Sequence, residues 1–398
     1  MAVLLTDGDQ RATLAVARSL GRAGIPVVVA EERESSIAGA SRFCFRRLRY
    51  PSPLQDPVGF QACVLEHVAR GGYDMVVPMT DITTLLLSPV RDRLETHVRL
   101  PMAPSSAQAQ ANDKREMMLA ATRVGIGTPA TYMLHEDDDL AKVAANLEYP
   151  VVLKPRFSRF LSEGRWVFGR VRYVHDPGEL QAQYRELHAQ IPCPLVQEKI
   201  EGDGSGVFLL VWNGVLKAAF CHRRLREKPP SGGVSVLRES APLDQPLLEK
   251  SLALLRAIGW NGVAMVEYKI DRRDGEAKLM EVNGRFWGSL QLAIDAGVDF
   301  PVMLYRLAKG EDVPPQLDYR VGVKSRWLLG DLDHLLIRWR HPAEANGLPG
   351  SLLSALLQFL KFHQRDTYYE VFKFDDPGPG WTELRQYCSQ LFHRPGKG

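Results

Sequence analysis

The start of the chain alternates between strand and helix patterns, and this alternation is the strongest constraint on its fold. Val3–Thr6 and Ile25–Ala30 are short apolar runs typical of buried strands, and apolar residues between them recur at helical spacing. A strand, a helix and a second strand in so short a stretch form a βαβ unit, which needs a parallel sheet. Helix and strand patterns continue in this order as far as a helix that starts at Asp81. We therefore predict an α/β protein whose residues 1–110 form an open parallel α/β domain.

Polar segments follow two of the predicted strands. In an open parallel sheet, ligands bind beyond the carboxyl ends of the strands. Thr6–Gln10 and Thr80–Asp81 fall at that edge, where they could help to form a substrate pocket or could serve only as helix caps. The loop after the first strand lacks a Gly-x-Gly-x-x-Gly pattern, so we expect no dinucleotide cofactor.

The rest of the chain changes character twice. Two hairpin signals, Asn213-Gly214 and Asp274-Gly275, each lie between apolar runs and predict antiparallel strands. Further on, two apolar patterns with helical spacing predict helices near the C-terminus. We expect three further units after the first domain: residues 111–195 and 196–310, which form the two parts of an α+β domain, and residues 311–398, a mainly helical C-terminal extension.

Composition excludes several classes of protein. Lysine and arginine number 50 against 47 aspartates and glutamates, so the net charge of +3 argues against a nucleic-acid-binding protein. The five cysteines are scattered without a Cys-x-x-Cys motif, which argues against a disulfide framework or a zinc ribbon. The sequence has no run of 18 apolar residues and no basic, apolar leader, so we expect a cytoplasmic protein with no transmembrane segment.

The second predicted hairpin carries acidic side chains. Residues two apart in a strand share a face, so this hairpin brings Glu267, Glu281 and Asn283 onto one surface, and the same alternation groups Leu279 with Glu281. Two carboxylates and an amide oxygen are hard ligands that suit Mg²⁺. The alternative is an exposed acidic face neutralised by neighbouring cations.

Other motifs precede this hairpin in a characteristic order. Lys114 starts the predicted connecting helix, and Lys154 ends an apolar strand. Val196-Gln-Glu-Lys-Ile follows a later strand, ahead of Glu267 and Glu281-Val-Asn-Gly-Arg. This set resembles the ATP-grasp superfamily over residues 1 to about 310. Within it the chain looks most like the carboxylate–amine ligases and the carbamoyl-phosphate-synthetase-like members.

The resemblance implies roles for individual residues. The two lysines that contact the α- and β-phosphates of ATP would be Lys114 and Lys154. The hinge that reads adenine would be Gln197, Glu198, Lys199 and Ile200. The magnesium ligands would be Glu267, Glu281 and Asn283, and Arg285 would steady the transferring phosphoryl group.

Two features depart from the family pattern. The acid that binds the ribose has no clear counterpart, and Glu201 and Asp203 are both candidates. The loop after the second lysine, residues 156–166, is long and basic instead of small and rich in glycine and serine. That loop could clamp the triphosphate, or it could bind an anionic substrate.

A basic segment follows the first predicted hairpin. Arg223 or Arg224, together with Arg238, could hold a carboxylate or an acyl phosphate, and the backbone at Gly232-Gly233 could approach the same anion. The alternative is a solvated basic loop. His222 lacks a nearby acid in the sequence, so we interpret it as structural.

The resemblance implies an ATP-dependent ligase that uses ATP and Mg²⁺. Such an enzyme activates a carboxylate as an acyl phosphate and joins it to an amine, releasing ADP and phosphate. Another ATP-grasp activity, such as a carboxylase or kinase, and a non-catalytic nucleotide-binding protein are the alternatives. We expect small carboxylate and amine substrates. The C-terminal helices mix aromatics with arginine and could touch a membrane surface, but packing on the core or on another subunit is the simpler interpretation.

Overall fold

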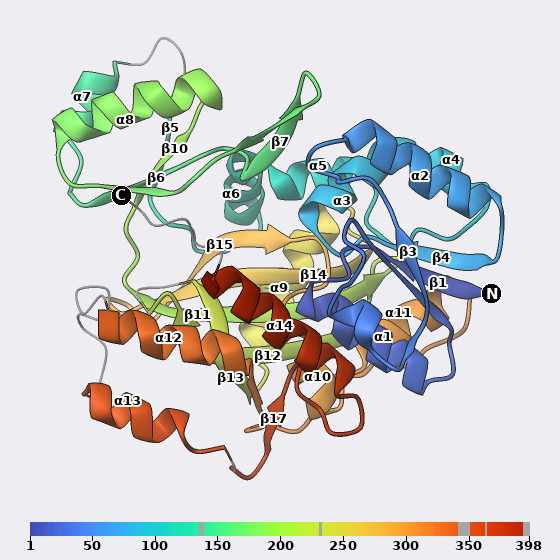
Figure 1. Ribbon diagram of the computed structural model, residues 1–398. Coiled ribbons are helices and arrows are strands. Elements are labelled where there is room, and N and C mark those ends of the chain that lie inside the picture. Colours follow the sequence, from blue (N-terminus) through green and yellow to red (C-terminus); the bar gives the residue numbers. More distant parts are fainter. Residues whose placement is uncertain (135–138, 231–232, 341–350, 363, 393–398) are drawn as a thin grey trace.

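The computed structural model describes residues 1–134, 139–230, 233–340, 351–362 and 364–392. Four β-sheets and the helices around them form an α/β structure with a helix-rich C-terminal region (Figure 1). Within these residues, no helix has both the length and the apolar character needed to cross a membrane.

The N-terminal sheet has the predicted parallel arrangement. Its strands lie in the order β3-β2-β1-β4, and every neighbouring pair is parallel. The strands are β1 (Ala2–Leu5), β2 (Val27–Glu31), β3 (Cys44–Arg49) and β4 (Tyr73–Val77). The helices of this region are α1 (Arg11–Arg22), α2 (Pro57–Ala69), α3 (Asp81–Leu87), α4 (Arg91–Glu95) and α5 (Ser105–Asn112), with short 3₁₀ turns η1 (Ala38–Ala40) and η2 (Ser88–Val90). Strands β1 and β4 are buried throughout, because helices cover both faces of a parallel sheet.

A small antiparallel sheet follows, connected through helix α6 (Lys114–Arg123). Its order is β5-β10-β6-β9, and the hairpin β7-β8 projects from it toward the N-terminal region (Figure 1). The strands are β5 (Thr131–Met133), β6 (Val151–Lys154), β7 (Arg159–Ser162), β8 (Arg165–Phe168), β9 (Arg172–Val174) and β10 (Leu195–Glu198). Helices α7 (Leu140–Ala145) and α8 (Pro177–Gln190) pack on one another beside this sheet.

The largest sheet has seven strands in the order β15-β14-β11-β12-β13-β16-β17. Its main strands are β11 (Gly202–Trp212), β12 (Val215–Lys228), β13 (Val234–Ala241), β14 (Gly262–Asp271) and β15 (Ala277–Asn283). Helices α9 (Gln245–Ala257), α10 (Leu290–Ala296) and α11 (Phe300–Ala308) belong to the same region. The turn between β11 and β12 is the predicted Asn213-Gly214 turn, and both residues have the positive φ that a type I′ hairpin turn requires.

Aspartate side chains mark where several helices begin. Each accepts a hydrogen bond from a backbone N–H in the first turn of its helix, which would otherwise lack a partner. These residues are Asp56 for α2, Asp113 for α6, Asp176 for α8, Asp244 for α9 and Asp299 for α11.

The C-terminal region contains the predicted helices and two strands that the sequence did not indicate. The helices are α12 (Leu328–Arg340), α13 (Leu352–Phe359) and α14 (Gly378–Phe392). The strands β16 (Lys324–Arg326) and β17 (Thr367–Tyr369) extend the large sheet, β16 pairing with β13 and β17 with β16. Each has three residues, and β16 buries Ser325 and Arg326 instead of apolar side chains, so neither shows the usual strand pattern.

One apolar core joins the first and last parts of the chain to the large sheet. It includes Leu14 of α1, Phe208 of β11, Trp287, Leu304 of α11 and Val371. The N-terminal region is therefore packed against the large sheet at a fixed place.

Buried ion pairs hold the same junction. The guanidinium of Arg18 in α1 is fully buried, and it donates to the carboxylate of Asp376 at 2.8 Å and to the carbonyl oxygens of Glu370, Val371 and Asp376. Ser41 Oγ and the backbone N–H of Arg42 also donate to the Asp376 carboxylate, so the N-terminal region holds the turn near residue 376 from two places.

We expect Arg18→Met to lower the free energy of unfolding by about 3–5 kcal/mol, because it leaves the Asp376 carboxylate buried without its charge partner. Urea denaturation followed by circular dichroism would measure the change. Arg22→Met is the matched control, since Arg22 pairs with Asp375 one turn later on the same helix but both side chains are exposed. The control should cost less than about 1 kcal/mol, and an equal loss in both variants would contradict the prediction.

Candidate functional site

The hairpin of β14 and β15 brings two carboxylates directly opposite one another. Glu267 pairs with Glu281 in the register of the two strands, and Asn283 lies at the end of β15 with its Nδ2 donating to Glu281 Oε1 at 3.0 Å. Burial and the neighbouring Glu281 raise the pKa of Glu267, while the guanidinium of Arg224 opposes that rise. The three side chains therefore lie together as the alternation predicted.

The grouping of Leu279 with these residues was wrong. Glu267 pairs with Glu281, but the next residue, Tyr268, pairs with Leu279, so Met280 is an extra residue in a β-bulge. The bulge turns Leu279 into the apolar core beside Tyr268. Met280 lines the cavity instead, a placement that simple alternation could not give.

Two lysines face the carboxylates from other elements. Lys154 ends β6 and its Nζ lies 4.0 Å from the sulfur of Met280, while Lys114 starts α6 and its Nζ donates to Ser158 Oγ at 2.6 Å. Burial lowers the pKa of both ammonium groups, that of Lys154 to about 8. The charge of Lys114 lowers the pKa of Lys154 further, whereas the carboxylate of Glu281 opposes the fall in the pKa of both lysines. Both lysines are therefore held in a partly desolvated setting where an anion would be strongly favoured.

A cavity of about 1450 Å³, including the part open to solvent, lies between the small antiparallel sheet and the large sheet. Both lysines, both carboxylates and Met280 line it, as do three of the four predicted hinge residues: Glu198, Lys199 and Ile200. Glu198 is fixed there by the N–H of Ala130 and by the guanidinium of Arg273. This cavity has an apolar side and a charged side, which suits a ligand with a flat apolar ring and an anionic chain.

Three other candidates lie outside the cavities, each because side chains alternate across a strand. Gln197 is buried on the far side of β10 and donates to Thr131 Oγ1 at 2.8 Å. Asp203 lies between Gly202 and Gly204, which line the cavity, but its own side chain is 87% exposed and pairs with Arg272. Arg223 is 68% exposed and donates to Glu239 at 2.7 Å, whereas His222 and Arg224 on either side line a cavity.

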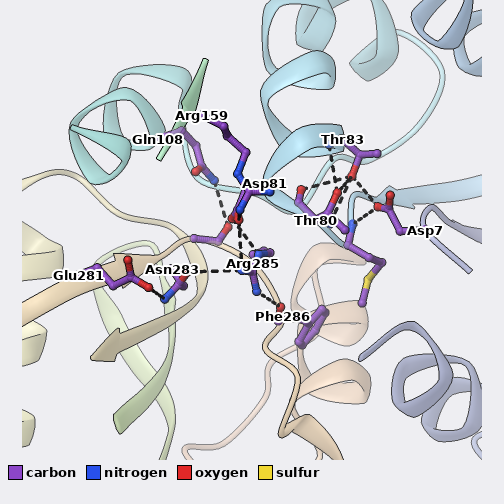
Figure 2. A network of polar contacts seen from close by, with 12 residues as sticks. Asp7, Thr80, Asp81, Thr83, Gln108, Arg159, Glu281, Asn283, Arg285 and Phe286 are labelled. Atoms are coloured by element: carbon purple, nitrogen blue, oxygen red, sulfur yellow. Dashed lines mark hydrogen bonds and ion pairs between the residues drawn. The ribbon is translucent and has the colours of Figure 1, made fainter. Parts of the chain in front are cut away.

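Arg285 is held by an aspartate from the N-terminal region. Its Nε and Nη2 donate to the two carboxylate oxygens of Asp81 at 2.7 and 3.1 Å, and Arg159 of the β7-β8 hairpin lies 3.4 Å from the same carboxylate (Figure 2). Burial alone would raise the pKa of Asp81, but the guanidinium of Arg285 holds it below its usual value. The second arginine comes from the basic loop 156–166, so part of this loop contacts the site through Asp81.

The polar edge of the N-terminal sheet has two roles. Thr80 caps α3 as the simpler interpretation of this segment predicted, while Asp81 beside it reaches Arg285. Asp7 is buried with a φ of 56° and accepts from the hydroxyl of Thr6 at 2.5 Å. It also accepts from the hydroxyl of Thr83 at 2.6 Å (Figure 2). It therefore fixes the loop after β1 to the start of α3, and so positions Asp81.

A second cavity opens on the other side of the two carboxylates. It is lined by Glu267, Glu281, Asn283 and Arg285 together with Arg224, Arg238, His222 and Arg11. Arg224 donates to Glu267 at 2.7 Å and to Glu227 at 2.9 Å. Gly233 lines this cavity as well, and Gly232 lies outside the described residues. His222 is buried, and its Nε2 is 2.9 Å from Ser289 Oγ, in keeping with the structural role predicted for it.

Several site residues were not identified from the sequence. Ser158, Glu227 and Met280 each contact or line the site, but they lie on different elements and carry no motif of their own. The position of Asp81 after a strand indicated the ligand-binding edge of the sheet, but its ion pair with Arg285 had no signal in the sequence.

Known proteins share this architecture. Residues 190–328 match the family model described as ATP-grasp in the biosynthetic pathway with Ter operon. Among solved structures, biotin carboxylase from Campylobacter jejuni is 15% identical with a TM-score of 0.64, over 81% of this chain and 74% of that one. L-amino acid ligase from Bacillus licheniformis is 18% identical with a TM-score of 0.60, over 77% and 74%. N5-carboxyaminoimidazole synthetase from Staphylococcus aureus is 14% identical with a TM-score of 0.64, over 97% and 96%.

A comparison with curated protein sequences gave no significant match. The family model and the solved structures agree on the architecture, so the chain has the ATP-grasp fold that the motifs predicted.

The low pKa of Lys154 makes anion binding in the first cavity depend on pH. The ammonium is charged below about pH 8 and loses its proton above it, so we expect affinity for inorganic tripolyphosphate to fall as the pH rises from about 7 to 9. Isothermal titration calorimetry would measure it. Lys154→Arg should keep the affinity at the higher pH, because a guanidinium stays charged, and the same pH dependence in this variant would contradict the assignment.

Proposed function

We propose that the protein is an ATP-dependent ligase that joins a carboxylate to an amine. In this reaction the γ-phosphoryl group of ATP moves to a carboxylate oxygen, and the amine then displaces phosphate from the acyl phosphate. The observation that carries the proposal is that two cavities share Glu267 and Glu281 in their linings. Both lysines line the first cavity, and Arg285 lines the second.

The first cavity suits ATP. The phosphate chain would lie along Lys114 and Lys154, whose ammonium groups act as mobile point charges. The adenine would lie against Glu198, Lys199 and Ile200, whose backbone borders the cavity. The bound ADP in the Staphylococcus aureus N5-carboxyaminoimidazole synthetase structure agrees with a nucleotide in a fold of this kind.

The carboxylate pair suits magnesium. Glu267 and Glu281 face each other with Asn283 beside them, and these are hard oxygen donors. Within the described residues, no group of three or more histidine, cysteine, aspartate or glutamate side chains could hold a metal, so phosphate and water oxygens would complete the coordination. When bound, Mg²⁺ would neutralise charge on the β- and γ-phosphates.

Arg285 and Arg224 supply the remaining positive charge at the reacting group. Arg285 is held rigidly by both oxygens of Asp81, so little reorganisation is needed when negative charge develops on the transferring phosphoryl group. Arg224 lies between Glu227 and Glu267 and lines both cavities. It would therefore hold the carboxylate substrate next to the metal ligands.

An assay with hydroxylamine as the amine tests the reaction class. With ATP, Mg²⁺ and a panel of carboxylates that includes bicarbonate and amino acids, we expect an acyl hydroxamate to form in equal amount with ADP. Coloured iron complexes of the hydroxamate and coupled detection of ADP would measure the two products. ADP without hydroxamate for every acid would favour kinase chemistry and would contradict the ligase proposal.

Glu281→Ala should reduce ADP formation by more than about a hundredfold, since it removes one of two carboxylates that would hold the metal. The thermal unfolding midpoint should stay within a few degrees. Glu276→Ala is the matched control, because Glu276 lies at the turn of the same hairpin, paired with Lys278 away from the cavities. Full activity of Glu281→Ala would rule out the metal assignment.

A further inference from the structure

The second cavity contains buried polar groups that the protein itself does not satisfy. In the described part of the chain, His222 Nδ1, Trp287 Nε1 and Arg238 Nε have no hydrogen-bond partner. The three side chains are only 2%, 1% and 1% exposed, and all three line this one cavity. A buried donor without a partner is costly, so such a group points to a ligand that completes it.

The unpartnered groups are mainly donors. The indole Nε1 and the guanidinium can only donate. Burial and the nearby cations Arg238 and Arg224 lower the pKa of His222, so its imidazole is neutral near pH 7. A ligand that matches this set must present acceptor oxygens.

The charge balance at the far end of the cavity favours an anion. Arg11 and Arg238 both form ion pairs with one carboxylate, that of Glu370, which also accepts from Ser325 Oγ. Glu383 is the other acid near Arg11, and burial raises the pKa of its carboxyl, which accepts from Trp327 Nε1. Burial lowers the pKa of Arg11 to about 10, so this guanidinium is still charged at neutral pH. Two buried guanidiniums therefore share one carboxylate.

The other two arginines of the cavity are paired elsewhere. Arg285 shares the carboxylate of Asp81 with Arg159, and Arg224 is paired with both Glu227 and Glu267. Arg11 and Arg238 share the carboxylate of Glu370, and Arg238 also has an unpartnered Nε. These two arginines are separate from the carboxylate pair of Glu267 and Glu281, where activation would occur. One cavity holds both places, so a single molecule can reach from one to the other.

The C-terminal region holds Arg11, which lines this cavity, in place. Trp327 stacks on the guanidinium of Arg11, with 4.0 Å from Cζ to the ring centre, and Glu370 follows strand β17. Gly288 leaves space on the opposite side, since a Cβ there would lie 3.3 Å from Arg11 Nη2. Arg11 is therefore held by stacking and by an ion pair with part of its guanidinium toward the cavity.

We propose that the carboxylate substrate carries a second anionic group, a carboxylate or a phosphate, which binds Arg11 and Arg238 while the first carboxylate is activated beside Glu281 and Arg285. This inference rests on the proposed function for the activation step. It assigns Arg11, Arg238 and Trp287 as residues that select a dianionic acid over a neutral one.

Matched pairs of ligands test the inference by binding alone. Titration calorimetry with ADP and Mg²⁺ present would compare succinate with succinamate, glutamate with glutamine, and 3-phosphoglycerate with glycerate. We expect the dianionic member of at least one pair to bind about tenfold more tightly, as befits a charge-assisted contact. The first two pairs report a second carboxylate and the third a phosphate.

Variants locate the contact. Arg11→Met should reduce the preference to less than about threefold, because the second anion loses one of its two guanidiniums. Arg238→Met should do the same and serves as the second variant if the first unfolds. Arg223→Met is the control, since Arg223 lies on the opposite face of the strand and should leave the preference unchanged. Equal affinity within every pair, no binding of any dianion, or a preference that survives in both folded variants would overturn the inference.

ADP formation separates this inference from the proposed function. Preferential binding of a dianion without ADP from any acid would leave the inference standing and count against the ligase activity. Equal rates of ADP formation with dianionic acids and with their neutral counterparts would support the ligase activity and count against the inference.

Discussion

Two carboxylates, Glu267 and Glu281, lie opposite each other across one strand pair, and most of the charged groups around them depend on that placement. Like charges so close raise each other's free energy unless cations surround them. Arg224 pairs with Glu267 within its own sheet, while Lys114 approaches the carboxylates from the start of α6 and Lys154 from the end of β6. Because these cations are themselves partly desolvated, the site favours binding of a polyanion, which pairs with the cations, together with a divalent cation, which pairs with the carboxylates.

The N-terminal sheet contributes to this balance at a distance. Asp81 does not line the first cavity, yet it fixes Arg285, which lines the second cavity together with both carboxylates. Asp7 is itself in a left-handed conformation, and by accepting from the hydroxyls of Thr6 and Thr83 it ties the loop after β1 to helix α3. The parallel sheet thus acts as a rigid support, and its polar edge meets the candidate site through the carboxylate of Asp81, which pairs with Arg285 and Arg159.

Much of the fold followed from local patterns. Asn213-Gly214 and the strand–helix alternation of the first thirty residues are short-range signals, and the elements they predicted are present. Candidate residues were harder to place, because a motif gives neighbours in sequence without saying which face each occupies. Gln197, Asp203 and Arg223 each lie one position from a residue that lines a cavity.

Long-range features had no local signal at all. The bulge at Met280 interrupts the regular alternation of side chains along β15. The position of this bulge is set by how β14 and β15 pair. Strands β16 and β17 are short and polar, so only their place beside β13 makes them strands. The ion pairs that Asp81 and Glu370 form with arginines far away in the sequence likewise had no local signal.

Glu370 forms ion pairs with Arg11 and Arg238, and Asp376 forms an ion pair with Arg18. Helix α1, which carries Arg11 and Arg18, is therefore bound at two points to the segment that contains residues 370 and 376. During synthesis the N-terminal sheet and the two lysines leave the ribosome long before this segment does. Arg11 and Arg238 would then be like charges side by side with no carboxylate between them. The second cavity can therefore reach its final form only in the last stage of folding, and its completion reports that the chain has been made through residue 376.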